Sequence, residues 1–510
     1  MHLSLNNSLG KWILPKEPSP FSPEATNYFS RLDAAGDTTY VDYKQPLANY
    51  IDSLVTLGGA YWDDMGSAAS FVGVGIQGVT VPLKSTMPTL TNNNFVVGDL
   101  DQLTGLKGDA STKYIDTNVA DNINGSTDIS AGIYVTEGSE LEFDAYFGSS
   151  ENGTGENKTL LSNGYATSIR VFSDVGDNTP SALDAPTGLI SSSRGTSASV
   201  DYRADGISGT ITRTGETPQG GDMYFFATNN SGPAIRHSDI RAAAMHFSTA
   251  MSSAELATLE GLQATLLSEI RTAHTFVAAA SYFSRLAAAG DTTHVAYKQP
   301  LTNYITSLVE LGGAYWDNMK SSASFVGVGI QGITVPLRDG MTVPTNNNFV
   351  AGDLNQLTGL KGDASTKYFG LNILGSVVEQ DNASISVYIT EADGAFGFHM
   401  GHQGNRLTLR NNPYVELNGA AAAPTNGKPT SKIFGGSRTT STDVDVRNNQ
   451  VTSTISNTSL SPSASTMFLF ARVTSASSKA RLATYHIGSA LDLATLEGLQ
   501  DTLITEIAAI

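Results

Sequence analysis

Three carboxylates at alternate positions are the side chains of this sequence whose spacing best suits catalysis. Glu140, Glu142 and Asp144 stand at i, i+2 and i+4, so on a strand they would point to one side of a sheet. Sandwich-fold glycosidases use carboxylates on one face as nucleophile and acid/base. The alternative is a solvated edge or loop face.

The histidines His399 and His402, in the run HMGH, could indicate a metal site. A zinc site needs three or four ligands, and no third ligand lies nearby in the sequence. We therefore predict a surface loop here. We predict no metal and no cofactor for the chain.

The glycine-rich run GVGIQG occurs at 73–78 and again at 327–332, and it fits the pattern G-x-G-x-x-G. Asp99 and Asp353 follow at about the distance that a ribose-binding acid needs. A dinucleotide site also requires a helix to begin within the motif, whereas β-branched residues and Pro82 follow here. The run is therefore predicted to be a glycine-rich strand or bulge.

Two other kinds of residue recur in the same way. His246 and His486 each precede a predicted helix, and we weigh catalysis there against a hydrogen-bonded structural role, which we favour. Trp62 and Trp316 each follow a tyrosine at a helix exit. Such rings can stack on sugars, but this position favours packing between helix and sandwich.

The chain contains its own test of these motifs, because its sequence is duplicated. Residues 28–114 return at 282–368 without a gap, offset by 254 residues, and about 69 of the 87 positions are identical. A site essential to function is expected in both copies. At this offset the three carboxylates meet no carboxylate, and His399 and His402 meet Ala145 and Gly148. Both motifs therefore fail as shared catalytic or metal sites.

Two helices are predicted at the start of the first copy. Ser22 followed by Pro23 indicates an N-cap with proline at the first helical position, and Gly36 indicates the end. A second helix is predicted from Pro46, where apolar residues recur at helical spacing. The glycines at 58–59 end it.

A closing helix follows each run of strands. Ser252 and Glu255 have capping-box spacing, and the apolar stripe of 256–270 returns at 493–507. Residues 282–289, the first helix of the second copy, follow almost directly. We therefore predict a short, helical linker between the two copies.

Short β-branched and aromatic runs fill the rest of each copy, separated by loops rich in Gly, Asn, Ser and Pro. This pattern is typical of an antiparallel sandwich, so the predicted fold class is mainly β, with two tandem antiparallel β-sandwich domains and helical connectors. Strands are predicted at 71–83, 129–136, 169–172, 223–227, 242–247, 385–390, 407–409 and 467–473. The predicted domains are an extended N-terminal arm (1–23), a helical lead-in (24–66), a first sandwich (67–251), a helical connector (252–320), a second sandwich (321–488) and a C-terminal helix (489–510).

Composition excludes several classes of partner. The net charge is −18, from 30 Lys and Arg against 48 Asp and Glu, and no segment concentrates basic residues. Nucleic acid and anionic membranes are therefore not expected partners. The chain has no cysteine, which excludes disulfides and thiolate sites. It has no apolar run long enough to span a membrane and no signal-peptide pattern, so we expect synthesis in a cytoplasm.

The arm carries the candidate assembly residues Trp12, Ile13 and Leu14. Four prolines between 15 and 23 oppose helix and central strand, which leaves these apolar residues on a segment without its own core. They either pack back on the first domain or anchor the arm to a partner subunit.

The whole pattern resembles a module of tailed-bacteriophage virion proteins. It consists of AAGDTTY and YKQPLANYI, then SASFVGVGIQ, TGLKGDASTKY, a strand such as ISVYIT, an R-x-A-x-x-H strand and a terminal L-x-x-L helix. It is similar to concanavalin A-like (laminin-G-like) jelly-roll domains. The resemblance implies a structural or adhesive virion component and fixes no sugar-binding residue.

We therefore predict a virion surface protein without enzymatic activity, in one of two places on the particle. One is a tail-fibre or baseplate adhesin whose loops contact host glycans, and the other is a capsid decoration or head-fibre protein. A sandwich glycosidase fails the two-copy test. Other virion proteins are the expected partners, and a homo-oligomer is expected, since three chains with two units each would match a six-fold site.

Overall fold

A computed structural model gives the conformation of most of the chain. It describes residues 21–122, 128–139, 144–150, 160–163, 169–172, 187–212, 220–392, 397–402, 407–410, 414–420, 427–472 and 478–510, with the backbone alone at 150, 160–163 and 169–172. The chain divides into two compact units, Met1–His274 and Thr275–Ile510. We call them unit 1 and unit 2.

The helices confirm the predicted start and stop signals. Ser22 caps the first helix by accepting the N–H of Ala25 at 3.1 Å, and Gly36 follows that helix with a φ of +79°. The predicted helical linker is one uninterrupted helix, which begins at the Ser252–Glu255 capping box. In the described residues the helices are α1 (Pro23–Ala34), α2 (Lys44–Leu57), α3 (Ser253–Ala288), α4 (Lys298–Leu311) and α5 (Leu493–Ala508). None of these helices combines the length and apolar character needed to cross a membrane.

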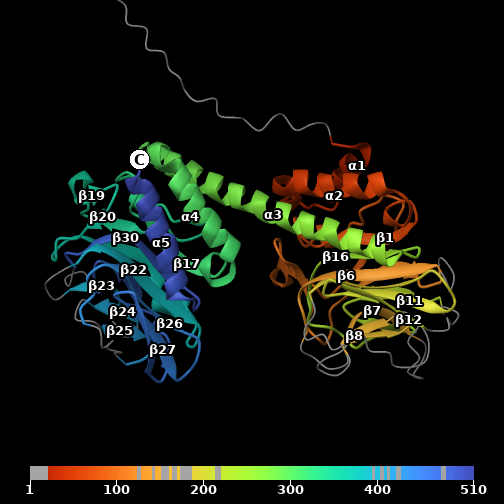
Figure 1. Cartoon of the computed structure of the whole chain (residues 1–510). Helices are drawn as coiled ribbons and strands as arrows, with labels where there is room; N and C mark the ends of the chain where they lie inside the picture. The colour runs from red at the N-terminus through yellow and green to blue at the C-terminus, as the bar shows by residue number, and fades with distance from the viewer. Residues whose placement is uncertain are drawn as a thin grey trace, which may run out of the picture. The chain divides into compact units, whose positions relative to one another are not determined.

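Unit 1 is a sandwich of two sheets (Figure 1). The first sheet runs in the order β12 (Ile207–Thr212), β11 (Ser199–Ala204), β10 (Gly188–Arg194), β6 (Ile129–Glu137), β16 (Arg241–Ser248), β4 (Gly105–Lys107) and β3 (Leu100–Asp101), and β1 (Met65–Ser70) also pairs with β16. The second sheet runs β15 (Ala234–Ile235), β14 (Thr228–Asn230), β7 (Asp144–Ser150), β13 (Asp222–Phe225), β5 (Tyr114–Ala120) and β2 (Thr91–Asn93), with β8 (Leu160–Asn163) on β7 and β9 (Ile169–Phe172) on β8. The pairs are antiparallel except β14 with β7.

Unit 2 repeats this architecture. Its first sheet runs β19 (Leu354–Asn355), β20 (Gly359–Lys361), β30 (Arg481–Gly488), β22 (Ala383–Glu391), β26 (Lys432–Arg438), β27 (Asp443–Asn448) and β28 (Val451–Ser456), and β17 (Met319–Ser324) pairs with β30. Its second sheet runs β18 (Thr345–Asn347), β21 (Tyr368–Leu374), β29 (Thr466–Leu469), β23 (Phe398–Gly401), β24 (Leu407–Arg410) and β25 (Tyr414–Leu417). The predicted fold class, two tandem antiparallel β-sandwiches of jelly-roll type with helical connectors, is confirmed.

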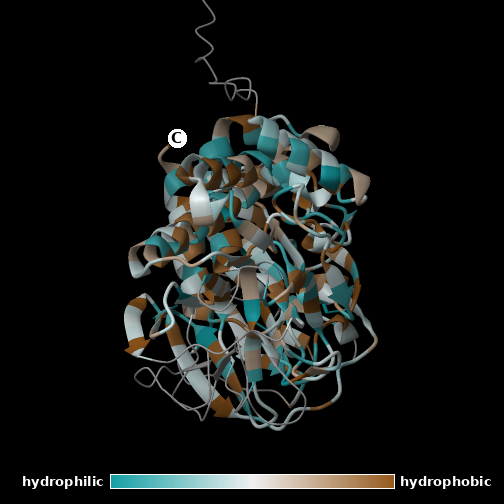
Figure 2. Cartoon of the chain, turned by 90° about the vertical axis from the view of Figure 1, so that its right-hand side faces the viewer, coloured by the Kyte–Doolittle hydropathy of each residue, from teal (hydrophilic) through white to brown (hydrophobic). Residues whose placement is uncertain are grey.

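The two faces of each sandwich differ in what covers them. α5 packs against β26 and β22 of the first sheet of unit 2, and in unit 1 the matching helix is bound to the first sheet through Glu260 of α3 and Arg203 of β11. Hydropathy colouring shows polar and apolar residues mixed along these helices and strands (Figure 2), as expected where one face is buried. Among the described residues no helix makes an extensive contact with either second sheet.

The segment 71–83 corrects one prediction, because it is not a strand. It forms bends, turns and a short 3-10 helix at Gly78–Thr80. The carboxylate of Asp37, 1% exposed, lies within it and accepts the N–H of Gly75 at 2.7 Å and of Thr39 at 2.8 Å. A Cβ on Gly78 would lie 2.1 Å from Asp37 Oδ2. The glycines therefore make room for a buried carboxylate instead of a ligand.

Unit 2 repeats this arrangement around Asp291. That carboxylate accepts the N–H of Gly329 at 2.8 Å and of Thr293 at 2.8 Å, and a Cβ on Gly332 would lie 2.0 Å from it. Because the arrangement is the same in both units, the glycine-rich run belongs to the architecture.

Candidate functional site

The predicted assembly and carboxylate residues are only partly within the described chain. Trp12, Ile13 and Leu14 lie outside the described residues, as do Glu140 and Glu142. The third carboxylate, Asp144 on β7, is 3% exposed and accepts a 2.6 Å hydrogen bond from the Ser238 hydroxyl. Asp144 is therefore within the packed interior, and the expected solvated face is wrong at this residue.

The histidines of the HMGH run are also buried, which corrects the predicted surface loop. His399 lies on β23, His402 directly follows it, and both are 0% exposed. His399 Nδ1 lies 3.0 Å from the Ser478 hydroxyl. No group of three or more His, Cys, Asp and Glu in the described residues could hold a metal ion.

The strand of His399 also shows where the two copies lose their common offset. The N–H of Phe470 donates to His399 O, as the N–H of Phe226 donates to Tyr146 O. His399 therefore takes the place of Tyr146, one residue away from the partner that the offset of 254 assigns. The segment before β23 is one residue shorter than the segment before β7. From this strand on, the offset of 254 therefore no longer pairs equivalent residues of the two units.

The recurring residues are buried, as a structural role requires, although the expected hydrogen bonding of the histidines is limited to His246 Nε2 at 3.5 Å from the Ser130 hydroxyl in the described residues. His246 and His486 are each 1% exposed on β16 and β30, and burial lowers their pKa to about 3 and about 4. Trp62 and Trp316 are 7% and 5% exposed, so little of either ring could meet a sugar.

A pair of aromatic rings on the second sheet is the feature that sequence analysis missed. Tyr114 of β5 and Tyr224 of β13 stack with their centroids 4.7 Å apart and their planes at 28°. Burial alternates along β5, with Ile115 inside and Tyr114 half-buried. Tyr224 is 6% exposed and its hydroxyl donates to Gly232 O at 3.1 Å. Tyr224 thus fixes the Tyr114 ring, which keeps a partly exposed side on the outer face.

Two carboxylates accompany this pair in unit 1. Asp116 pairs with Tyr224 in the β5–β13 register, and Asp222 begins β13. Burial, together with the charge of Asp222, raises the pKa of Asp116, although the N–H of Asn118 donates to it at 2.8 Å. Burial and the charge of Asp116 raise the pKa of Tyr224 to about 12. An aromatic ring beside hydrogen-bonding carboxylates is a combination that can hold a polar ligand with an apolar face.

Unit 2 has the same aromatic pair at matching positions. Tyr368 of β21 meets Phe468 of β29 edge to face, with centroids 5.7 Å apart. Gly370 and Thr466 stand where unit 1 has Asp116 and Asp222. The rings are therefore shared between the units, and the charges around them are not.

Half of this pair could have been found from the sequence. Tyr114 and Tyr368 both end the run TGLKGDASTKY, and their recurrence was visible. Their partners Tyr224 and Phe468 lie beyond loops of different length, so the fixed offset does not match them. Only the sheet register brings each pair together.

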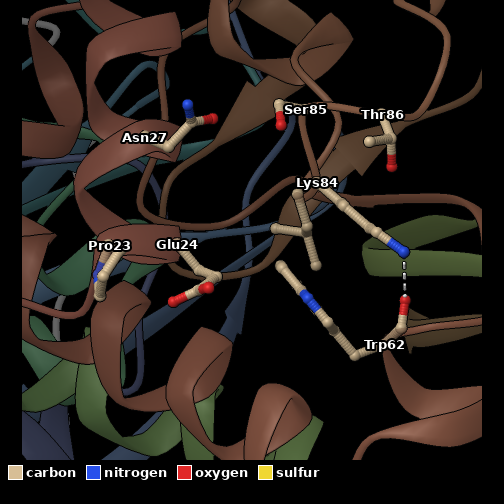
Figure 3. A pocket seen from close by; sticks show the side chains of 8 residues that line it. Pro23, Glu24, Asn27, Trp62, Lys84, Ser85 and Thr86 are labelled. Atoms are coloured by element: carbon tan, nitrogen blue, oxygen red, sulfur yellow. Dashed lines mark hydrogen bonds between the residues drawn. The ribbon is translucent and has the colours of Figure 1, made fainter.

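Unit 1 also has a polar pocket of about 290 Å³ beside the start of α1 (Figure 3). Lys84 crosses it and donates to the carbonyl oxygens of Trp62 and Asp63 at 2.9 and 2.7 Å. The pocket is lined by Pro23, Glu24, Asn27, Trp62, Leu83, Lys84, Ser85 and Thr86. Ala278 and Gly340 stand at the places of Glu24 and Thr86 in unit 2, so this pocket does not belong to the duplicated pattern.

No protein-family model matches this chain, and no curated protein sequence matches it. Solved structures are similar to it at low identity. A Trypanosoma rangeli sialidase in complex with the inhibitor DANA matches at 13% identity and a TM-score of 0.24, over 34% of this chain and 28% of the sialidase. Domain 4 of the Geobacillus stearothermophilus arabinanase AbnA, in complex with arabinotriose, matches at 9% identity and a TM-score of 0.25. The match covers 39% of this chain and 98% of the arabinanase domain. Domains LG4-5 of the mouse laminin alpha1 chain match at 9% identity and a TM-score of 0.23. The match covers 74% of this chain and 86% of the laminin domains.

These similarities concern the fold, and they correct one prediction. The chain spans less than a third of the sialidase that it matches. Laminin LG domains are among these similar structures. We expected a protein without enzymatic activity, but the similar structures include glycosidases. The prediction that this chain is not an enzyme is therefore wrong as an inference from this fold and is withdrawn.

Proposed function

We propose that this chain is a surface protein of a tailed-phage particle, a tail-fibre or baseplate adhesin, that contacts host glycans with the outer face of the second sheet in each unit. The virion assignment is supported by the sequence resemblance. The contact face is supported by one observation, the aromatic pair that both units keep at Tyr114–Tyr224 and Tyr368–Phe468.

The physical reason lies in the rigidity of the exposed rings. A sugar has an apolar face of C–H groups and a rim of hydroxyls, which suits an aromatic ring with polar neighbours. Tyr114 is already held by Tyr224, so binding a sugar would cost little side-chain entropy. Asp116 and Asp222 of unit 1 could accept hydrogen bonds from sugar hydroxyls, and bonds to charged acceptors are the stronger kind.

The test is a glycan array probed with the full chain and with the double variant Tyr114→Ala, Tyr368→Ala. We expect the variant to lose roughly tenfold or more in affinity, about 1.4 kcal/mol or more. Tyr202→Ala, on β11 of the first sheet, is the matched control and should bind as the unchanged chain does. Equal binding by all three proteins would contradict the proposal.

The alternative place on the particle is the capsid, as a decoration or head-fibre protein whose arm binds the shell through Trp12, Ile13 and Leu14. Immunogold labelling of intact particles separates the two. Label on the tail supports the adhesin, and label on the head supports the decoration protein.

A second candidate function is cleavage of the bound glycan in unit 1. It is favoured by Asp116, whose pKa is raised by burial and by the charge of Asp222, since a carboxyl group of raised pKa can serve as the acid of a glycosidase. New reducing ends released by the full chain, and lost in Asp116→Asn, would support it. Binding without release would support the adhesin alone.

A further inference from the structure

The outer face of the second sheet in unit 2 also carries a basic cluster, which is separate from the aromatic pair Tyr368 and Phe468. It lies on β23 and β24 and just after β29, which the strand order places in the same sheet; β23 and β24 lie side by side in Figure 1. The guanidinium carbons of Arg410 and Arg472 lie 5.2 and 5.5 Å from the centroid of the Phe398 ring. Two cations therefore converge on one aromatic side chain.

The cluster is held in place from below. Arg410 Nη2 donates to Glu416 Oε1 at 2.6 Å, and the Glu416 side chain is 7% exposed. Arg472 Nε donates to His402 O at 3.4 Å. The guanidinium groups of Arg410 and Arg472 both act on the Glu416 carboxylate, in a chain whose net charge is −18.

One donor of the cluster is left over. Among the described residues, the buried Nε–H of Arg410 has no hydrogen-bond partner. A buried donor without a partner costs about 1–3 kcal/mol, so an anionic oxygen that reached this donor after a small movement of the side chain would recover that energy. An anionic oxygen is the acceptor that a guanidinium group binds best.

In the part of unit 1 whose side chains the structure describes, this cluster has no counterpart. The bonds that match His399 with Tyr146 place Ala145 where unit 2 has Phe398. The charged residues that we describe on the second sheet of unit 1 are instead the carboxylates Asp116 and Asp222. The duplicated face is thus acidic beside the rings in unit 1 and basic farther along the sheet in unit 2.

We propose that unit 2 binds carboxylate-bearing sugars, with Arg410 and Arg472 contacting the carboxylate, whereas unit 1 does not. This inference rests on the proposed glycan contact and names its ligand class in unit 2. The geometry assigns the sugar ring to Tyr368 and Phe468, and the charge to the arginines.

The experiment is a calorimetric titration of the full chain with a hyaluronan oligosaccharide, whose glucuronic acids carry the carboxylates, and with the same oligosaccharide after carboxyl reduction. We expect the charged form to bind at least tenfold more tightly. Arg472→Gln should remove that difference, and Arg472→Lys should restore some of it. Arg271→Gln, an exposed arginine of α3, is the control for the loss of one charge and should change nothing.

Arg472→Gln is the main variant because it leaves the buried Arg410–Glu416 pair intact. Equal affinity for the charged and reduced forms, or a preference that survives in Arg472→Gln, would overturn the inference. If Tyr368→Ala abolishes binding and the unchanged chain binds the charged and reduced forms equally, the proposed glycan contact is supported and the basic site is not. A charge preference that Tyr368→Ala does not change would support the basic site and count against the aromatic face.

Discussion

Burial at single residues makes this protein sensitive to acid. His246 and His486 stay neutral in the folded chain, with pKa values of about 3 and about 4 against an ordinary value near 6.5. Below pH 6.5 the unfolded chain takes up protons that the folded chain does not. The free energy of unfolding should therefore fall as the pH decreases from about 6.5 towards 4, by up to roughly 1.4 kcal/mol per pH unit for each histidine.

Urea unfolding of the full chain between pH 7 and pH 4 measures this slope. His246→Gln should lower the stability at pH 7, where the native side chain packs well, and should flatten the slope. The comparison with the unchanged chain removes the contribution of the many carboxylates. The same slope in both proteins would show that His246 is protonated in the folded state.

The buried carboxylate of Asp37 requires a glycine at position 78. Gly78→Ala would place a Cβ 2.1 Å from Asp37 Oδ2. We expect a loss of about 1–3 kcal/mol, as overpacking a filled site costs. Gly98→Ala, where no atom lies within 4 Å, should stay within about 0.5 kcal/mol of the unchanged chain. Thermal unfolding monitored by circular dichroism compares the two.

At the scale of elements, a buried ion pair fastens each closing helix to its sandwich. Arg447 of β27 binds Glu497 of α5, whose side chain is 3% exposed, while the pair Lys361–Glu391 is half exposed. Glu497→Ala leaves a poorly solvated guanidinium group and should cost about 3 kcal/mol. Glu391→Ala should cost less than about 1 kcal/mol. Equal costs in denaturant unfolding would show that Arg447 finds water or another partner.

Elements with strong local signals were predictable, and those set by distant contacts were not. The N-cap at Ser22 and the capping box at Ser252 are written within four residues of sequence, so the helices began where expected. The strands β6 and β16 cover the strands predicted at 129–136 and 242–247. The segment 71–83 has a similar composition, but it folds around the carboxylate of Asp37. That carboxylate accepts the N–H of Gly75, which lies 38 residues further along the chain. No local pattern reveals such a contact.

The candidate site was out of reach for the same reason. Tyr224 becomes a partner of Tyr114 only through the register of β13 against β5. Arg410 and Glu416 meet across the β24–β25 hairpin, and Arg472 arrives from the end of β29. The duplication identified the residues that both units need for their fold. The residues that differ between the units could be placed in a candidate site only from the strand pairing.

At the scale of the whole molecule, each unit holds its own core. The last two turns of α3 supply Tyr282 and Leu286, both 0% exposed, to unit 2. A fragment of residues 275–510 should therefore fold alone and unfold in one cooperative transition. Calorimetry of the fragment tests this. A broad transition, or none, would mean that unit 2 depends on residues of unit 1.

The carboxylate within the glycine run also offers a way to find distant relatives of this chain. Asp37 and Gly75, like Asp291 and Gly329, are joined by a hydrogen bond across 38 residues in both units. The resulting signature combines an aspartate followed by two threonines with G-x-G-x-x-G at a fixed distance along the chain. A sequence pattern built on that spacing would retrieve proteins by a shared structural constraint even where their surfaces have changed beyond alignment.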